Sequence, residues 1–281
     1  MSIELNFARE IQMSMLPLIF PAFPLRKEVT LFATLHPARE VGGDFYDFYF
    51  LDDDHMCFVI GDVAGKGAPG ALLMAVSKTL IKSRAADDSS PSSILTHVNN
   101  ELSEENESAM FVTVFLGILN VKTGELVYTN AGHNPPYIKR SDGNLQKLDA
   151  FHGPVIGAMP ELTYKQDSDT LGKNDTILLY TDGVTEALDI EDQLYSDPKL
   201  VELLLAQEYK TPKEMVEVVA EDVKVFQGDA EQADDITILA IQYYGLLEET
   251  GMNKLQLKIK NQLEQLGEIE DEFFEFALQN D

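Results

Sequence analysis

The chain has 281 residues, of which 44% are hydrophobic and 25% charged, a composition typical of a folded domain with a sizeable core. Its formal net charge of -27 argues against a nucleic-acid partner and against an anionic membrane surface, because phosphate groups are bound by Lys and Arg. No apolar stretch approaches the roughly 20 residues that span a bilayer, no signal peptide is evident, and Cys57 is the only cysteine. The sequence therefore predicts a cytoplasmic protein without disulfides.

The first expected element is a helix over residues 3–16. Its apolar residues recur at helical spacing, and Pro17 ends it. The apolar face consists of Leu5, Ala8, Ile11 or Gln12, and Met15. This face would be exposed unless it met a second chain or the surface of the domain.

Strands and helices follow in an order that is not a βαβ repeat. Apolar, β-branched runs predict strands at residues 29–36, 45–51, 56–62, 111–120, 125–130, 137–139, 145–148, 176–180 and 236–243. Helical spacing predicts helices over residues 69–84, from about 91 to 102, and over 200–205 and 212–226. Strands, then a helix pair, then strands, then helices favour an α+β fold with mainly antiparallel sheets.

Four acidic segments, far apart in the chain, lie at the ends of these apolar runs. They are Gly42-Gly43-Asp44-Phe45-Tyr46-Asp47, Gly61-Asp62-Val63-Ala64-Gly65-Lys66-Gly67, Thr181-Asp182-Gly183 and Asp234-Asp235-Ile236-Thr237. A carboxylate at a strand end is held rigidly, and Gly lets the backbone approach a ligand closely. Carboxylates gathered at one rim repel one another unless a cation neutralises them. Hard cations such as Mg²⁺ and Mn²⁺ favour this all-oxygen chemistry.

Several residues near these segments have more than one interpretation. Lys66 either touches a substrate phosphate or is solvated, and its glycine neighbours do not have the spacing of a nucleotide-binding loop. His133 is either a general acid or part of a structural turn. Asp47 is expected to fix the loop that carries Asp44, and Glu186 to occupy the first turn of a helix.

With these segments the chain resembles the SpoIIE-type branch of the metal-dependent (PPM) serine/threonine protein phosphatases, over about residues 5–243. The motifs occur in the order of that family. They are Ala8-Arg9-Glu10-Ile11-Gln12, Met15-Leu16-Pro17, Arg39 to Asp47, Gly61 to Gly67, Asn130-Ala131-Gly132-His133-Asn134-Pro135-Pro136, Tyr180 to Ala187, and Asp234 to Thr237. The resemblance implies two stacked, mainly antiparallel β-sheets flanked by helices.

The resemblance also implies a site for two Mn²⁺ or Mg²⁺ ions, in which Asp62 bridges both ions and the Val63 backbone carbonyl binds one. The other implied ligands, direct or through water, are Asp44, Asp182 and Asp234, with Asp235 as the alternative to Asp234. The expected catalytic residues are Asp44, Asp62, Asp182 and Asp234. Two cations roughly 3.5–4 Å apart can activate a water and clamp a phosphate for in-line attack, so no nucleophilic side chain is required.

The implied function is a phosphoserine/phosphothreonine phosphatase of bacterial stress or sporulation signalling. Its implied substrate is a phosphorylated STAS-domain anti-sigma-factor antagonist. Two other classes remain open: a catalytically silent binding module with the same fold, and a hydrolase of small phosphoesters. Activity on a phosphopeptide, compared with a free phosphomonoester, separates them.

The expected organisation has three parts. Residues 1–20 form a regulatory linker helix, residues 21–245 the phosphatase domain, and residues 246–281 an acidic C-terminal extension. The helix resembles the linker through which a sensor or partner controls activity in relatives, and a homodimer through it is one expected arrangement. The extension resembles the opening strand and helix of an anti-sigma-factor kinase domain, without its ATP-binding motifs.

Overall fold

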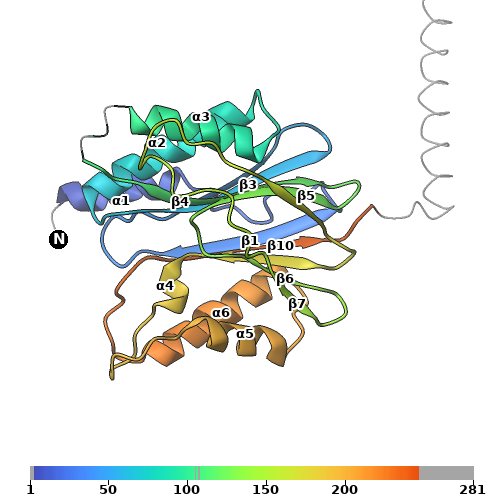
Figure 1. Ribbon diagram of the computed structural model, residues 1–281. Helices are drawn as coiled ribbons and strands as arrows, with labels where there is room; N and C mark the ends of the chain where they lie inside the picture. The colour runs from blue at the N-terminus through green and yellow to red at the C-terminus, as the bar shows by residue number, and fades with distance from the viewer. Residues whose placement is uncertain (1–2, 105, 107, 247–281) are drawn as a thin grey trace, which may run out of the picture. The chain divides into compact units, whose positions relative to one another are not determined.

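Two antiparallel β-sheets pack face to face, and helices cover both outer faces (Figure 1). The computed structural model describes residues 3–104, 106 and 108–246. In the described part of the chain, the residues up to Gly245 form one compact unit. The prediction for the C-terminal extension therefore lies almost wholly outside the described residues.

The first sheet has the strand order β2-β3-β4-β5-β8, with every neighbouring pair antiparallel. Its strands are Phe45–Phe50 (β2), His55–Val63 (β3), Val112–Asn120 (β4), Glu125–Ala131 (β5) and Asp167–Thr170 (β8). The helices Ala68–Ala85 (α2) and Pro91–Ser103 (α3) cover its outer face, and the other sheet covers its inner face. Because β3 and β4 are covered on both sides, their sequences are continuous apolar runs rather than alternating ones.

The second sheet has the order β1-β10-β9-β6-β7, and its described pairings are also antiparallel. Its strands are Val29–His36 (β1), Tyr137–Lys139 (β6), Leu145–Lys147 (β7), Thr176–Tyr180 (β9) and Ile236–Tyr243 (β10). The helices Asp197–Ala206 (α5) and Pro212–Gln227 (α6) lie on its outer face (Figure 1). The helix α6 begins sharply because Thr211 accepts a hydrogen bond from the Glu214 amide at 3.1 Å.

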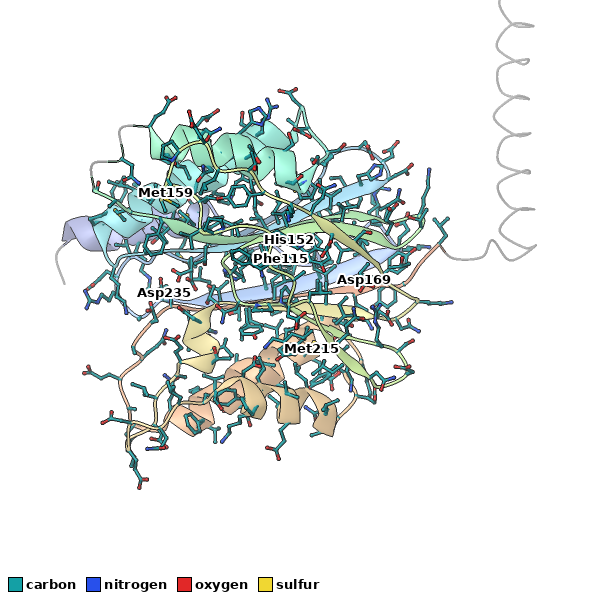
Figure 2. The ribbon with its side chains drawn as sticks, viewed as in Figure 1. Phe115, His152, Met159, Asp169, Met215 and Asp235 are labelled. Atoms are coloured by element: carbon teal, nitrogen blue, oxygen red, sulfur yellow. The ribbon has the colours of Figure 1, made fainter. Side chains whose placement is uncertain are left out.

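The hydrophobic core has two parts, one on each side of the second sheet. Between the sheets, Phe115 is fully buried and stacks on Phe58 and Tyr128. Below the second sheet, Met215 of α6 packs in a second cluster with residues of α5, β9 and β10. Figure 2 labels Phe115 between the layers and Met215 among the lower helices.

The structure confirms the predicted fold class and each predicted strand to within a residue or two at its ends. The sequence did not indicate β8, which is a polar edge strand, or the single-turn helix Asp182–Thr185 (α4). Glu186 follows α4 instead of beginning a helix, so that prediction is wrong. In the described part of the chain, no helix is long and apolar enough to cross a membrane.

The N-terminal helix, Ile3–Ser14 (α1), lies beside α2, and of the two alternatives Ile11 and Gln12 it is Gln12 that turns inward. Gln12 and Leu16 are buried, whereas Ile11 and Met15 are 44% and 42% exposed. Ile11 and Met15 line an apolar groove of about 280 Å³ together with Leu72 of α2. The apolar stripe therefore flanks an open groove, and a polar side chain makes the inward contact.

Candidate metal centre

The four acidic segments meet because antiparallel strands alternate in direction. In the first sheet, β2 begins where β3 ends, with Phe45 opposite Gly61. The start of β4 lies beside them, because Asp62 is opposite Thr113. Residues 44, 62 and 63 are thereby placed at one end of this sheet.

The second sheet brings its own acidic segments to the same end. There β9 ends beside the start of β10, with Tyr180 opposite Ile238, and β1 ends with His36 opposite Ile236. Asp182 follows β9 directly, and the pair at residues 234–235 precedes β10. Figure 2 labels Asp235 at this end, between the two layers.

A cavity of about 290 Å³ opens at this end of the sandwich. Four of its lining residues are carboxylates, and the Val63 segment and the exposed Arg39 also line it. The carboxylates are Asp62, Asp182, Asp234 and Asp235. Five of the six residues expected at the site therefore surround one cavity, and Asp44 is the exception.

Asp44 lies behind the cavity wall and is only 2% exposed. Its Oδ2 accepts hydrogen bonds from the hydroxyls of Thr181 at 2.7 Å and Thr237 at 2.6 Å. Asp44 precedes β2 in the first sheet, whereas the threonines belong to the second sheet and its edge. The buried carboxylate thus ties the two layers together beneath the site.

Asp235 uses both carboxylate oxygens on backbone groups. Its Oδ1 accepts from the Ala38 amide and its Oδ2 from the Gly43 amide, each at 2.9 Å. A Cβ at Gly42 would overlap this carboxylate, and a Cβ at Gly183 would overlap the Asp235 carbonyl oxygen. Both glycines are therefore required by close approach to Asp235, and its oxygens are already engaged in holding the loop before Asp44.

Asp234 faces the cavity more freely. Its side chain is 40% exposed, and its Oδ2 lies 2.8 Å from Nζ of Lys66. The same ammonium donates to the Ala233 carbonyl at 2.7 Å. Lys66 is therefore partly exposed but paired, and it neutralises one carboxylate at the edge of the cavity.

Burial and mutual repulsion raise the pKa values of three carboxyls at this end of the sandwich, Asp44, Asp62 and Asp182. The pKa of Asp62 rises to about 7, first through burial and then through the charge of Asp182. Burial raises the pKa of Asp182 to about 6, and the nearby Glu186 and Asp234 charges add to the rise. The pKa of Asp44 is raised well above its usual range by burial and by Asp62. Such crowding is the electrostatic condition that a divalent cation relieves.

The donor set fits a hard cation that keeps some of its own water. Among the described residues, no group of three or more His, Cys, Asp or Glu side chains is arranged to hold a metal ion on its own. The cavity does combine carboxylate oxygens with a backbone carbonyl segment at Val63. Mg²⁺ and Mn²⁺ accept such mixed oxygen shells, and Mg²⁺ commonly keeps several waters.

His133 is buried outside the set of residues that line the cavity. Its Nδ1 lies 2.8 Å from the hydroxyl of Thr113, and burial lowers its pKa to about 4. Its own backbone N–H donates to the Asn130 side chain at 2.8 Å, and Asn130 donates back to its carbonyl oxygen at 3.0 Å. A neutral imidazole in this turn supports the structural interpretation over the general acid.

Two further contacts were not evident from the sequence. The Gln12 side chain makes a two-bond clamp on the backbone of Gly42, donating to its oxygen at 2.6 Å and accepting from its N–H at 3.1 Å. Asp47 pairs with Lys78 of α2 at 2.6 Å, so its carboxylate holds a helix instead of the Asp44 loop. In the sequence, these contacts were indicated only by a glutamine within an apolar stripe and by a carboxylate within an apolar strand.

Comparison with known proteins identifies the family of this sequence. The family model for Stage II sporulation protein E (SpoIIE) matches residues 52–244. Protein IcfG from Synechocystis is 30% identical over 85% of this chain and 41% of its own length. Phosphoserine phosphatase RsbU from Bacillus subtilis is 30% identical over 85% of this chain and 70% of its own length. The chain thus spans less than half of the Synechocystis relative.

A solved structure shows the same fold. The SiaA-PP2C domain of Pseudomonas aeruginosa superposes with a TM-score of 0.75 at 24% identity, covering 85% of this chain and 96% of that one. The superposition covers most of both chains, so the sandwich has the fold of PP2C domains. Together with the family match, it confirms the resemblance drawn from the motifs.

Asp62→Asn should stabilise the metal-free protein, and more at pH 8 than at pH 5. Because the pKa of Asp62 is raised in the folded state, the stability it contributes is present at low pH and is lost as pH rises through about 7. The substitution removes this loss, and we expect a gain of about 2–4 kcal/mol at pH 8. Urea unfolding in the presence of a chelator measures it, with exposed Asp87→Asn as the control. A gain that did not depend on pH would contradict the prediction.

Proposed function

Because the chain belongs to the SpoIIE family, we propose that it is a metal-dependent protein phosphatase that hydrolyses phosphoserine and phosphothreonine. The convergence of three cavity-facing carboxylates, at 62, 182 and 234, around one cavity is the observation that carries this proposal. The raised pKa values of Asp62 and Asp182 indicate a site with excess negative charge, where a cation binds favourably.

We assign the metal-binding residues from the exposure of each side chain to the cavity and from the hydrogen bonds that it already makes. Asp62 and Asp182 face the cavity from the ends of β3 and β9, and the Val63 segment lies beside them. Asp234 is favoured over Asp235, because its side chain is 40% exposed, whereas Asp235 is buried and holds two amides of the loop before Asp44. Asp44 supports Asp62 from beneath. Two Mn²⁺ or Mg²⁺ ions bound there would supply positive charge and an activated water for attack on phosphorus.

The remaining cavity residues fit a phosphate substrate. Arg39 lies at the exposed rim of the cavity, and guanidinium groups bind phosphate oxygens in a fork. Thr113 places a hydroxyl half-buried beside Asp62. The cavity is small for a protein ligand, so it accepts a phosphorylated side chain while the rest of the substrate stays outside.

The substrate we propose is a phosphorylated STAS-domain anti-sigma-factor antagonist. Support comes from the family match and from the 30% identical relative named as a phosphoserine phosphatase, RsbU. The open alternatives are a silent binding module and a hydrolase of small phosphoesters. The cavity retains all of its carboxylates, which favours an enzyme over a silent module.

We also propose that α1 carries regulation by pairing with α1 of a second copy of this chain. Phe7 and Ile11 of α1, and Met15 directly after it, are exposed, as are Leu72 and Val76 of α2, so apolar side chains are exposed on both helices. The groove between them has almost no polar lining, which suits the apolar stripe of another α1. Through the Gln12 clamp on Gly42, a shift of α1 would reach the loop before Asp44.

Removal of divalent cations should abolish phosphate release. Activity should return with Mn²⁺ or Mg²⁺ and poorly with Zn²⁺, because no His or Cys is among the described residues that line the cavity. Phosphate release from a phosphoserine protein, measured after chelation and after each addition, tests this. Full activity after exhaustive chelation would rule out a metal-dependent reaction.

Asp62→Asn should lower turnover by several orders of magnitude while the protein remains folded, since it removes the charge at the centre of the cavity. The measurement is phosphate release from a phosphoserine peptide and from p-nitrophenyl phosphate at matched Mn²⁺, with circular dichroism to confirm folding. Asp87→Asn is the matched control. Near wild-type turnover would defeat the site assignment, and preference for the small ester would favour the small-molecule hydrolase.

Deleting residues 1–16 should convert a dimer to a monomer and change the rate of phosphate release. The deletion removes the exposed apolar stripe and the Gln12 clamp together. Light scattering coupled to gel filtration measures the size of both proteins. Ile11→Ser with Met15→Ser separates the two effects, because it keeps the clamp. A wild-type monomer would contradict pairing through α1.

A further inference from the structure

The carboxylate of Asp44 is oriented by two buried threonines from the opposite sheet. Thr181 and Thr237 are both fully buried, and both hydroxyls lie within 2.7 Å of the same oxygen, Oδ2. Thr181 follows β9, and Thr237 is the second residue of β10. The two donors therefore come from adjacent strands and converge on one atom of a third segment.

The hydrogen-bond directions are fixed by the surrounding backbone. The hydroxyl oxygen of Thr181 accepts the Thr237 backbone N–H at 3.0 Å, so its own proton is free to go to Asp44. Thr237 donates its hydroxyl to the same Oδ2. An oxygen that accepts two donors in this way cannot also carry a proton. Asp44 thus has Oδ2 engaged by two donors, and Oδ1 is the oxygen that remains for the metal centre.

We propose that Thr181 and Thr237 are positioning residues that hold Asp44 so that a single oxygen serves the metal centre. The inference rests on the proposed function, since it concerns the same site. The threonines do not line the cavity, and they act through the Asp44 carboxylate. Without them, the side chain of Asp44 could rotate and direct either oxygen, or neither, toward Asp62.

The arrangement also explains why both motifs contain a threonine. Thr181 directly precedes the cavity residue Asp182, and Thr237 follows Asp235 by two residues. Each segment thereby supplies a carboxylate to one side of the backbone and a hydroxyl to the buried side. Supporting groups of this kind typically contribute 10- to 100-fold to metal affinity.

The test is calorimetric titration of the whole chain with Mn²⁺ alone, which needs no substrate. Thr237→Val keeps the shape and removes the hydroxyl, and we expect Mn²⁺ to bind about tenfold more weakly. Thr181→Val is the second variant, and the double variant should lose more than either. Thr237→Ser restores the donor and should return affinity to within about twofold. Thr176→Val, a buried threonine at the other end of β9, is the matched control.

A second readout separates positioning from general destabilisation. At saturating Mn²⁺, phosphate release by Thr237→Val should recover to within about threefold of wild type, while the half-saturating Mn²⁺ concentration rises about tenfold. Unchanged Mn²⁺ affinity in both valine variants, or equal losses in the serine variant, would overturn the inference. Wild type that binds Mn²⁺ without releasing phosphate would refute the proposed function alone, and wild type that binds no Mn²⁺ would refute both.

Discussion

The buried carboxylate of Asp44 is the constraint on which the rest of the site depends. It belongs to the first sheet, yet its hydrogen bonds come from Thr181 and Thr237 in the second. A carboxyl group that is only 2% exposed is tolerated only where fixed hydrogen-bond donors satisfy its oxygens. The two layers must therefore pack in one register at this end, and that register sets where the other carboxylates emerge.

A second carboxylate, that of Asp235, fixes the loops around the site in a similar way. Asp235 holds the backbone at Ala38 and Gly43, while Gln12 holds Gly42 from the opposite side. The short segment before Asp44 is thus fixed by the start of β10 and by the N-terminal helix at once. A site assembled on strand ends can be rigid in its core and still be sensitive to a helix that lies on its surface.

Electrostatics places opposing demands on this end of the molecule. The fold buries acidic groups close together, and burial first and repulsion second raise the pKa values of Asp62 to about 7 and of Asp182 to about 6. Lys66 offsets the charge of Asp234 only in part, since both side chains remain about two-fifths exposed. This crowding lowers the stability of the metal-free fold and favours the binding of cations, a compromise that functional sites commonly show.

The sequence by itself determined the strands, the fold class and the set of acidic segments. Apolar runs such as the one before Asp62 are long and continuous, so their period and length identify buried strands without tertiary information. Polar β8 and the one-turn helix α4 carried no such signal, because neither has an apolar pattern of its own. The sequence left Ile11 and Gln12 as alternatives for the inward face of α1, and only the structure shows that the polar Gln12 makes the buried contact.

Only the tertiary structure decided which contacts each acidic residue makes. In the sequence, Asp234 and Asp235 are adjacent and chemically identical, and nothing local distinguishes them. In the fold, Asp235 turns inward onto two backbone amides, and Asp234 stays 40% exposed beside Lys66. The burial of Asp44, the position of His133 behind Thr113 and the pairing of Asp47 with Lys78 were decided in the same way. Each depends on which groups two separately formed sheets bring into contact, and the local sequence does not encode that contact.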